Sequence, residues 1–197
     1  MQGRVVFAGD SVTDCGWRGD SDGLGHGYVR LLAATHELAG CSVRNVGKGG
    51  DRLQDLERRW RRDVLDARPD AVSVMIGIND TWRRFDSGEV SGIEEFSDRY
   101  RALLSSLPTD TQIVLMEPFL IPVDARQQEW RQDLDPRIHV VRLLGQEFGA
   151  TVVPVDGALN RRAASVGAAA LASDGVHPTA AGHREIASAW LTAVAPS

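Results

Sequence analysis

Phe7-Ala8-Gly9-Asp10-Ser11-Val12-Thr13-Asp14 is the segment from which the rest of this chain can be interpreted. The apolar run 5–8 predicts a short buried strand, because β-branched and aromatic side chains suit a pleated, covered surface. Gly9 permits a sharp turn out of that strand. Ser11 then lies just past the strand's carboxyl end, at the edge where open α/β sheets bind ligands. On this segment alone, a helix cap is favoured over a nucleophile.

The composition predicts one globular domain over residues 1–197, since 43% of the chain is hydrophobic and 25% is charged. The net charge of -5 argues against nucleic acid as a partner. No run of about 18 apolar residues predicts a membrane-spanning helix, so we expect no membrane association. The first strand begins too early for a signal peptide, which favours a cytoplasmic location. Cys15 and Cys41 lack metal-ligand spacing, as do the histidines, and we expect no metal.

Predicted strands and helices alternate along the chain. Apolar runs predict strands over 5–8, 42–46, 71–76, 112–116 and 151–155. Helical periodicity predicts helices over 28–38, 53–67, 94–107, 125–148 with a break at Pro136, 159–166 and 180–194. This alternation is typical of βαβ units and predicts a mostly parallel sheet in a three-layer α/β/α sandwich.

Polar and glycine-rich residues follow the ends of the first three predicted strands. Ser11 follows the first strand, Gly50 the second and Asn79 the third. Because the carboxyl ends of parallel strands meet at one edge of a sheet, we expect these residues in one crevice. Asp174 and His177 lie in a late loop before the last predicted helix, and that loop can reach the same edge.

These residue types suit acyl transfer. A serine hydroxyl is a weak nucleophile unless a base takes its proton, and His177 can be that base for Ser11. Asp174 can hold the other ring nitrogen and fix the tautomer. The backbone amides of Ser11 and Gly50 and the side-chain amide of Asn79 are candidate donors to an oxyanion. Each motif alone is also typical of a turn or helix cap, and their joint occurrence at successive strand ends favours catalysis.

Four blocks together resemble those of the SGNH hydrolases, the GDSL-type esterases and lipases. They are Gly9-Asp10-Ser11, Asn45-Val46-Gly47-Lys48-Gly49-Gly50, Gly77-Ile78-Asn79-Asp80 and Asp174-Gly175-Val176-His177-Pro178. The resemblance implies Ser11 as nucleophile, His177 as base, Asp174 as its orienting acid, and Gly50 and Asn79 as oxyanion donors. It further implies a flavodoxin-like five-stranded sheet of order 2-1-3-4-5 and a reaction without cofactor.

Further motifs resemble the branch of this family that contains intracellular acetylxylan esterases, which deacetylate short xylo-oligosaccharides. They are the stretches 11–16, 24–29, 75–83 and 115–119. Ser173 departs from that branch, in which a tryptophan is expected, and the departure concerns the sugar contact rather than the reaction. We therefore expect a serine esterase for small acyl esters, with acetylated carbohydrates favoured. A broader short-chain carboxylesterase or thioesterase, or a non-catalytic sugar-binding module, stays open as an alternative.

Asp10, Trp82 and Arg83 are candidate substrate-binding residues beside the expected site. Trp82 could stack on a sugar ring, although core packing suits a tryptophan equally well. Arg83 could attract a polar substrate, although a surface ion pair is the simpler expectation. Acidic residues interleave with arginines in the predicted helix 53–67, which is typical of a solvated or interface face. Trp60 in that helix would then mark a partner surface, as in a homo-oligomer.

Overall fold

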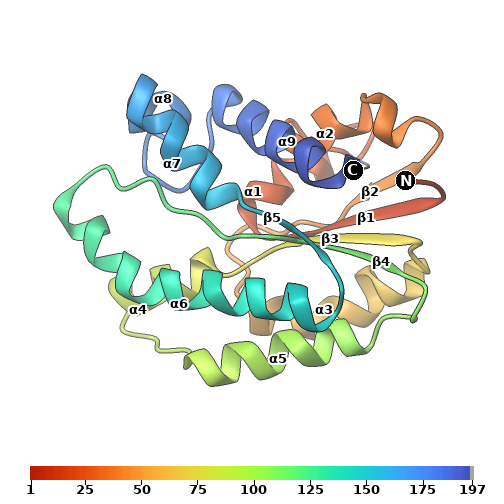
Figure 1. The fold of residues 1–197 in the computed structure, drawn as a ribbon, viewed down its shortest axis with the longest axis horizontal. Coiled ribbons are helices and arrows are strands. Elements are labelled where there is room, and N and C mark those ends of the chain that lie inside the picture. The colour runs from red at the N-terminus through yellow and green to blue at the C-terminus, as the bar shows by residue number, and fades with distance from the viewer. Residues whose placement is uncertain (196–197) are drawn as a thin grey trace.

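A sheet of five parallel strands runs through the middle of the molecule (Figure 1). This computed structural model describes residues 1–195. The strands are β1 (Arg4–Gly9), β2 (Ser42–Asn45), β3 (Ala71–Met75), β4 (Gln112–Met116) and β5 (Thr151–Val153). Their order is β2-β1-β3-β4-β5, and every neighbouring pair is parallel. The flavodoxin-like order expected from the resemblance is therefore confirmed.

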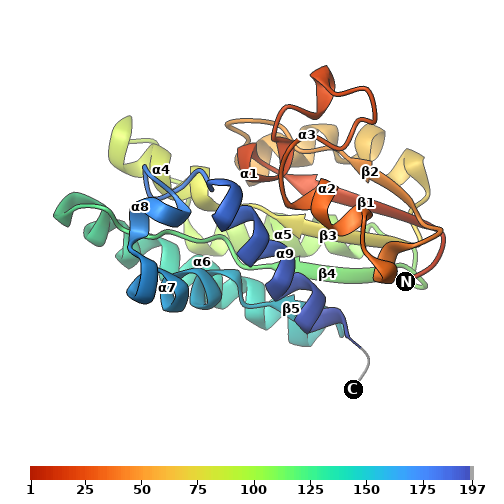
Figure 2. The same ribbon diagram turned by 90° about the horizontal axis from the view of Figure 1, so that it is seen from above.

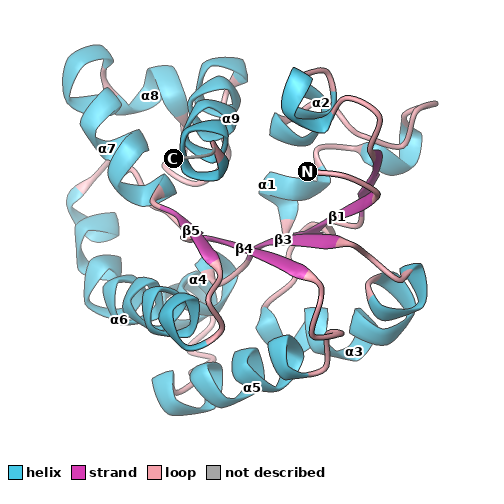
Figure 3. Cartoon of the chain, turned by 45° about the vertical axis from the view of Figure 1, so that its right-hand side comes forward, coloured by secondary structure: helices cyan, strands magenta, loops and turns pink. Residues whose placement is uncertain are grey.

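Helices cover both faces of the sheet, as Figure 3 shows. They are α1 (Ser11–Asp14), α2 (Tyr28–Ala33), α3 (Leu53–Asp63), α4 (Ile78–Asp86), α5 (Ile93–Ser105), α6 (Ala125–Glu147), α7 (Val155–Val166), α8 (Ala168–Leu171) and α9 (Ala180–Val194). Helices α2 and α9 lie side by side over one face, with α7 beside α9 (Figure 2). Helices α3, α5 and α6 cover the other face. The predicted α/β/α sandwich is confirmed.

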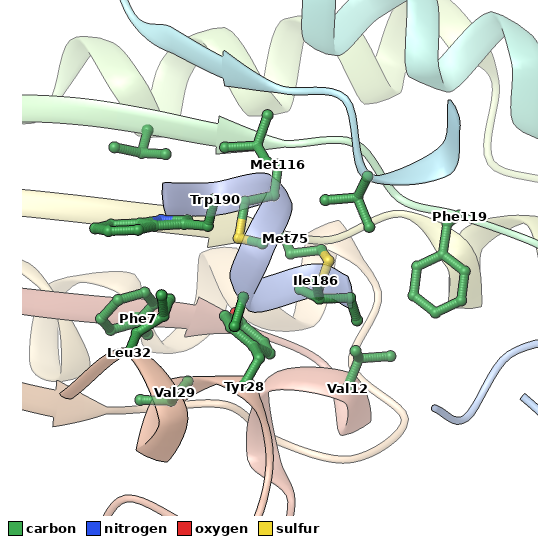
Figure 4. Close-up of a cluster of buried hydrophobic side chains, with 14 of the residues drawn as sticks. Phe7, Val12, Tyr28, Val29, Leu32, Met75, Met116, Phe119, Ile186 and Trp190 are labelled. Atoms are coloured by element: carbon green, nitrogen blue, oxygen red, sulfur yellow. The ribbon is translucent and has the colours of Figure 1, made fainter. Parts of the chain in front are cut away.

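Strand β1 supplies side chains to both layers of the core. Phe7 belongs to the cluster under α2 and α9, where it contacts Tyr28 and Trp190 (Figure 4). Val6 and Ala8 belong to the cluster on the opposite face, under α3, α5 and α6. Successive strand side chains point to opposite faces, so a strand covered on both sides is apolar at every position. This burial holds the carboxyl end of β1, and therefore Ser11, in place.

Several expected helices differ from the structure. The helix predicted over 53–67 ends at Asp63, the one predicted over 159–166 begins at Val155, and the sequence predicts no helix where α4 lies. The helix predicted over 28–38 ends at Ala33, and a separate 3₁₀ turn covers His36–Leu38.

The break predicted at Pro136 is wrong, because α6 continues through it. A proline within a helix removes one backbone hydrogen bond. Leu134 and Ile138, on either side of it, are both buried, and their packing keeps the helix continuous.

Trp60 does not lie on an exposed surface that a partner could contact, contrary to expectation. Its side chain is 3% exposed, and its Nε1 donates a hydrogen bond to Ser106 Oγ at 2.9 Å. Arg59, its neighbour in α3, is also buried instead of solvated. Trp60 lies against the end of α5, and Arg59 lies against the ends of β1 and β2, because α3 packs between them. No helix within residues 1–195 has the length and apolarity needed to cross a membrane.

Candidate active site

Ser11 begins helix α1 directly after strand β1. Asp10 caps this short helix, because its Oδ1 accepts a hydrogen bond from the Val12 amide at 3.0 Å. The turn needs a glycine just before it. A Cβ on Gly9 would lie 2.3 Å from the Met75 carbonyl oxygen and 2.4 Å from Thr13 Oγ1. The strand can therefore turn at Gly9 and present the Ser11 hydroxyl at the edge of the sheet.

The structure brings Ser11, His177 and Asp174 into one hydrogen-bonded chain. Ser11 Oγ lies 3.0 Å from His177 Nε2, and His177 Nδ1 lies 2.6 Å from Asp174 Oδ2. A carboxylate only accepts hydrogen bonds, so Nδ1 carries the proton and Nε2 is free to accept one from the hydroxyl. The order hydroxyl, imidazole, carboxylate is the geometry of an activated serine nucleophile.

Asp174 is held firmly by its own loop. Its Oδ1 accepts hydrogen bonds from the amides of Val176 at 3.0 Å and His177 at 2.7 Å. Burial works to raise the pKa of Asp174, but these bonds and the one from the His177 ring outweigh it and lower that pKa. The side chains of His177 and Asp174 are 49% and 45% exposed, so a substrate can reach them from solvent.

Asn79 lies in the first turn of α4, and its side chain is almost completely buried. Its Nδ2 donates one hydrogen bond to the backbone carbonyl of Asp51 at 3.0 Å. A side-chain amide has two N–H groups, so one hydrogen remains available to a ligand. The bond to Asp51 thereby orients the group and links it to the loop that carries Gly50.

Gly50 belongs to an exposed loop that packs against α1. Its φ of +78° favours glycine, and no atom beyond its two chain neighbours lies within 4 Å of where a Cβ would be. A Cβ on Gly47 would lie only 2.3 Å from the amide nitrogen of Asp14, and the Gly49 amide donates to Asp14 Oδ2 at 2.9 Å. The loop therefore lies beside Ser11, with open space around Gly50.

Two of the three candidate substrate contacts have other partners. Asp10 is 1% exposed and lies beneath Ser11, where burial raises its pKa to about 7 against the hydrogen bond from Val12. Its side chain is a helix cap and is closed to substrate. Arg83 pairs with Asp86 on its own helix at 2.5 Å, which is the simpler of the two expectations for it.

Trp82, the third candidate, lies beside the histidine. Its ring centroid is 5.9 Å from that of His177 and 5.5 Å from that of Trp130. Phe85 also stacks on Trp130, so Trp82 belongs to a small aromatic cluster, and it remains half-buried. Trp130 has no signal in the sequence that would link it to this site, because it lies far away in α6.

Gln127 is a second contributor that sequence reasoning missed. From the first turns of α6, its Nε2 donates to the Asp174 carbonyl at 2.7 Å, while its Oε1 accepts from the Val123 amide at 3.0 Å. It thereby ties the Asp174 loop to α6. Within residues 1–195, no three His, Cys, Asp or Glu side chains gather as metal ligands.

Comparisons with known proteins agree with this geometry. The model of the GDSL-like lipase/acylhydrolase family matches residues 7–185. An acetylxylan esterase from Geobacillus stearothermophilus is 38% identical over 95% of this chain and 92% of its own length. A solved variant of that esterase superimposes with a TM-score of 0.89 at 34% identity, covering 98% of this chain and 94% of the other. An α/β hydrolase from the metagenome of Lake Arreo gives 0.85 at 32% identity, covering 96% and 94%.

Several variants of the Geobacillus esterase have been solved. Three are catalytic mutants, in which a serine, an aspartate or a histidine is replaced by alanine. The histidine follows the aspartate by three residues, as His177 follows Asp174. A tryptophan, replaced in a further variant, directly precedes that aspartate, whereas this chain has Ser173. From the family match and the identity over nearly its full length, this chain belongs to the GDSL-like lipase/acylhydrolase family and is a carboxylic ester hydrolase.

Proposed function

We propose that this chain is a serine esterase that removes acetyl groups from short xylo-oligosaccharides. The observation that carries the proposal is the hydrogen-bonded chain from Ser11 Oγ through His177 to Asp174. The catalytic serine, aspartate and histidine of the Geobacillus esterase support the same roles here.

In the first half of the reaction, Ser11 Oγ attacks the ester carbonyl carbon while His177 Nε2 takes the hydroxyl proton. Asp174 stabilises the imidazolium that forms. The tetrahedral intermediate then expels the sugar oxygen, to which His177 returns the proton, and an acetyl-serine remains. In the second half, His177 takes a proton from water, the resulting hydroxide attacks the acetyl carbon, and acetate leaves as Ser11 regains its proton.

The intermediate carries a negative oxygen that needs hydrogen-bond donors. The amides of Ser11 and Gly50 and the free N–H of Asn79 are the proposed donors. Support comes from the bond between Asn79 and the Asp51 carbonyl, because a donor that is already oriented stabilises the transition state without reorganisation. The open space around Gly50 leaves room for the acetyl group.

The proposed carbohydrate specificity rests on two observations. Trp82 presents an aromatic ring beside His177, where a sugar attached to the scissile ester could stack. The half-exposed His177 leaves space for a leaving group larger than the acetyl group. The acetylxylan and acetyl-xylooligosaccharide esterase names of the Geobacillus protein support the same substrate class.

The test is acetate release from acetylated xylo-oligosaccharides by wild type and by Ser11→Ala. We expect release by wild type that disappears in the variant, while thermal melting shows that both proteins are folded. Equal release by both would contradict the proposed nucleophile. No release by wild type would contradict the substrate class and would redirect the assay to other small acyl esters.

Ser173 favours a second candidate, a broader short-chain carboxylesterase or thioesterase. Without the tryptophan that precedes the aspartate in the Geobacillus esterase, the sugar contact on this side is weaker. Turnover of acetyl, butyryl and octanoyl esters and of acetyl thioesters separates the candidates. A sugar-binding module would need neither the base nor its carboxylate, so affinity without turnover is the result that would favour it.

Several sequence-based expectations stay predictions. These are the cytoplasmic location, the lack of nucleic-acid and membrane partners, self-association into a homo-oligomer, and a reaction without cofactor. Gel filtration with light scattering tests the oligomer, and the acetate assay in the presence of a chelator tests the need for a metal.

A further inference from the structure

We propose that Arg59 is a positioning residue that aligns the oxyanion donors with the nucleophile. The inference rests on the proposed function, because it concerns the same acyl-transfer site. Arg59 lies in the middle of α3, among arginines that are exposed, but its own side chain is only 6% exposed. A guanidinium is costly to bury unless its hydrogen-bonding groups are satisfied, so its contacts indicate why it is there.

The guanidinium of Arg59 joins the ends of two neighbouring strands. Its Nη2 donates to the Gly9 carbonyl, at the end of β1, at 3.0 Å. Its Nη1 donates to the Val46 carbonyl, just after β2, at 2.6 Å. The Lys48 amide donates to the same Gly9 carbonyl at 3.0 Å. Arg59 thus fixes the loop that follows β2 against the turn that presents Ser11.

The same side chain also holds the oxyanion donors. Arg59 Nε donates to Asp51 Oδ2 at 2.5 Å. Asp51 directly follows Gly50, and its carbonyl oxygen accepts the hydrogen bond from Asn79 Nδ2 at 3.0 Å. The ion pair therefore restrains the Gly50 amide along the chain and the Asn79 amide through one hydrogen bond. The three proposed donors come from three different strand ends, and Arg59 is bonded to two of those ends and linked to the third.

Lysine would not replace arginine here. Four acceptors surround the Arg59 guanidinium, namely the carbonyls of Gly9 and Val46 and the carboxylates of Asp51 and Asp63, and the planar group reaches all of them in a fixed geometry. The lysine ammonium is a compact charge on a flexible chain and does not span them. Arg59→Lys therefore keeps the charge and most of the volume but loosens the loop.

The experiment measures kcat and KM for 4-nitrophenyl acetate. It compares wild type, Arg59→Lys, Asn79→Ala and the double variant, with Arg62→Lys as the matched control. Arg62 lies in the same helix and is 76% exposed, and its side-chain hydrogen bonds within residues 1–195 go to the Asp63 carboxylate, which also accepts one from Arg59. Thermal melting of each protein separates a folding defect from a catalytic one.

We expect Arg59→Lys to lower kcat by roughly 10- to 100-fold, because a small misplacement of catalytic groups costs about that much. KM should change by less than about twofold, since ground-state binding does not use the oxyanion donors. In the Asn79→Ala background, Arg59→Lys should cost less than about threefold more, because residues that act as a unit are not additive. Arg62→Lys should match wild type.

A kcat for Arg59→Lys within about twofold of wild type would overturn the inference. So would an equal fold-loss in the presence and absence of the Asn79 amide, because that result belongs to a purely structural residue. If Arg59→Lys does not fold, Asp51→Asn is measured by the same two criteria, since it keeps the shape and the carbonyl of Asp51. An inactive wild type would instead contradict the proposed function itself, so the two failures can be told apart.

Discussion

Two nucleophile–histidine pairs lie within a few residues of each other at the ends of α1. Ser11 Oγ is 3.0 Å from His177 Nε2, and Cys15 Sγ is 3.1 Å from His183 Nε2. By distance alone the two pairs are equivalent. Both a hydroxyl and a thiol can act as a nucleophile beside a histidine base, and the ionised thiol is intrinsically the stronger of the two.

Their surroundings differ at the second ring nitrogen. His177 Nδ1 faces the Asp174 carboxylate, which stabilises a positive imidazolium. His183 Nδ1 instead accepts a hydrogen bond from the Tyr28 amide at 3.2 Å. An amide N–H in that position opposes protonation of Nδ1, so His183 stays neutral, with its hydrogen on Nε2 facing the Cys15 sulfur. His183 is also only 5% exposed, whereas His177 is half exposed.

The surroundings of Cys15 and His183 disfavour the charged form of both side chains. Burial, together with the charges of Asp14 and Asp10, raises the pKa of the Cys15 thiol to about 11. Burial lowers the pKa of His183 to about 4. Transfer of a proton from the thiol to the ring is therefore strongly unfavourable, and the thiolate, which is the reactive form, does not accumulate. The two pairs show that contact distance alone does not identify a nucleophile, since only the serine pair has both a carboxylate behind its base and access to solvent.

Replacement of Ser11 or Cys15 by alanine should produce the largest difference between the two pairs. Ser11→Ala should lower kcat for 4-nitrophenyl acetate by about 10⁶-fold, as loss of a triad nucleophile does elsewhere. Cys15→Ala, the matched control, should change kcat by less than about twofold. Loss of activity in Cys15→Ala with activity kept in Ser11→Ala would reverse the roles of the two pairs.

Removal of the carboxylate behind His177 should make the serine pair resemble the cysteine pair. Asp174→Asn should lower kcat by about 10⁴-fold, because the amide favours the wrong tautomer of the ring. The melting temperature should change little, since an asparagine oxygen can still accept from the amides of Val176 and His177. Asp86→Asn, on the surface of α4, serves as the control. Full activity of Asp174→Asn would mean that another carboxylate orients His177.

The proposed oxyanion donor Asn79 is a further difference between the serine pair and the cysteine pair. Asn79→Ala should lower kcat by about 10²- to 10³-fold, or roughly 2.7–4 kcal/mol of transition-state stabilisation. KM should stay nearly constant, because the donor acts on charge that develops only in the transition state. Steady-state kinetics with 4-nitrophenyl acetate measure both constants. An unchanged kcat would rule out the proposed role of Asn79.

The last prediction involves no change in activity. It concerns the pH dependence of folding stability that arises from His183 in the cysteine pair. The pKa of His183 is lower in the folded chain than in the unfolded one, so its contribution is complete above about pH 6.5. As the pH falls from there to about 4, the unfolded state takes up a proton that the folded state does not. Wild type should therefore lose on the order of 3 kcal/mol of stability across that range.

His183→Gln should flatten this pH dependence, whereas His139→Gln, at an exposed position, should not. Urea unfolding at several pH values measures the free energy of unfolding for all three proteins. An identical acid dependence in wild type and His183→Gln would mean that His183 is not buried in its neutral form.

Much of the candidate site could be predicted from local sequence because its parts depend on local chemistry. Gly9 must lack a side chain for β1 to turn, and Asp174 and His177 lie close enough in sequence for one loop to hold both. The apolar character of β1 and β3 reports burial on both faces, which is a property of each strand separately. These features can be recognised in the sequence without knowledge of the rest of the fold.

The failures concern residues whose surroundings come from distant parts of the chain. The charges around Arg59 and Trp60 predict a solvated helix, yet the packing of α3 against the sheet and α5 buries both. Asp10 is part of the Gly9-Asp10-Ser11 motif and directly precedes the nucleophile. Its side chain nevertheless points inward, where it caps α1.

The sequence alone was sufficient to predict the α/β/α sandwich and to predict that residues 11, 174 and 177 would meet, because strand periodicity and strand-end motifs are encoded locally. Tertiary packing, in contrast, determines which of the two nucleophile–histidine pairs is open to solvent, and which arginine of α3 is buried beside the proposed oxyanion donors. Burial, ring tautomer and shifted pKa values depend on groups brought together from positions up to 168 residues apart, as Cys15 and His183 are. Such contacts exist only after the sheet and its helices have packed.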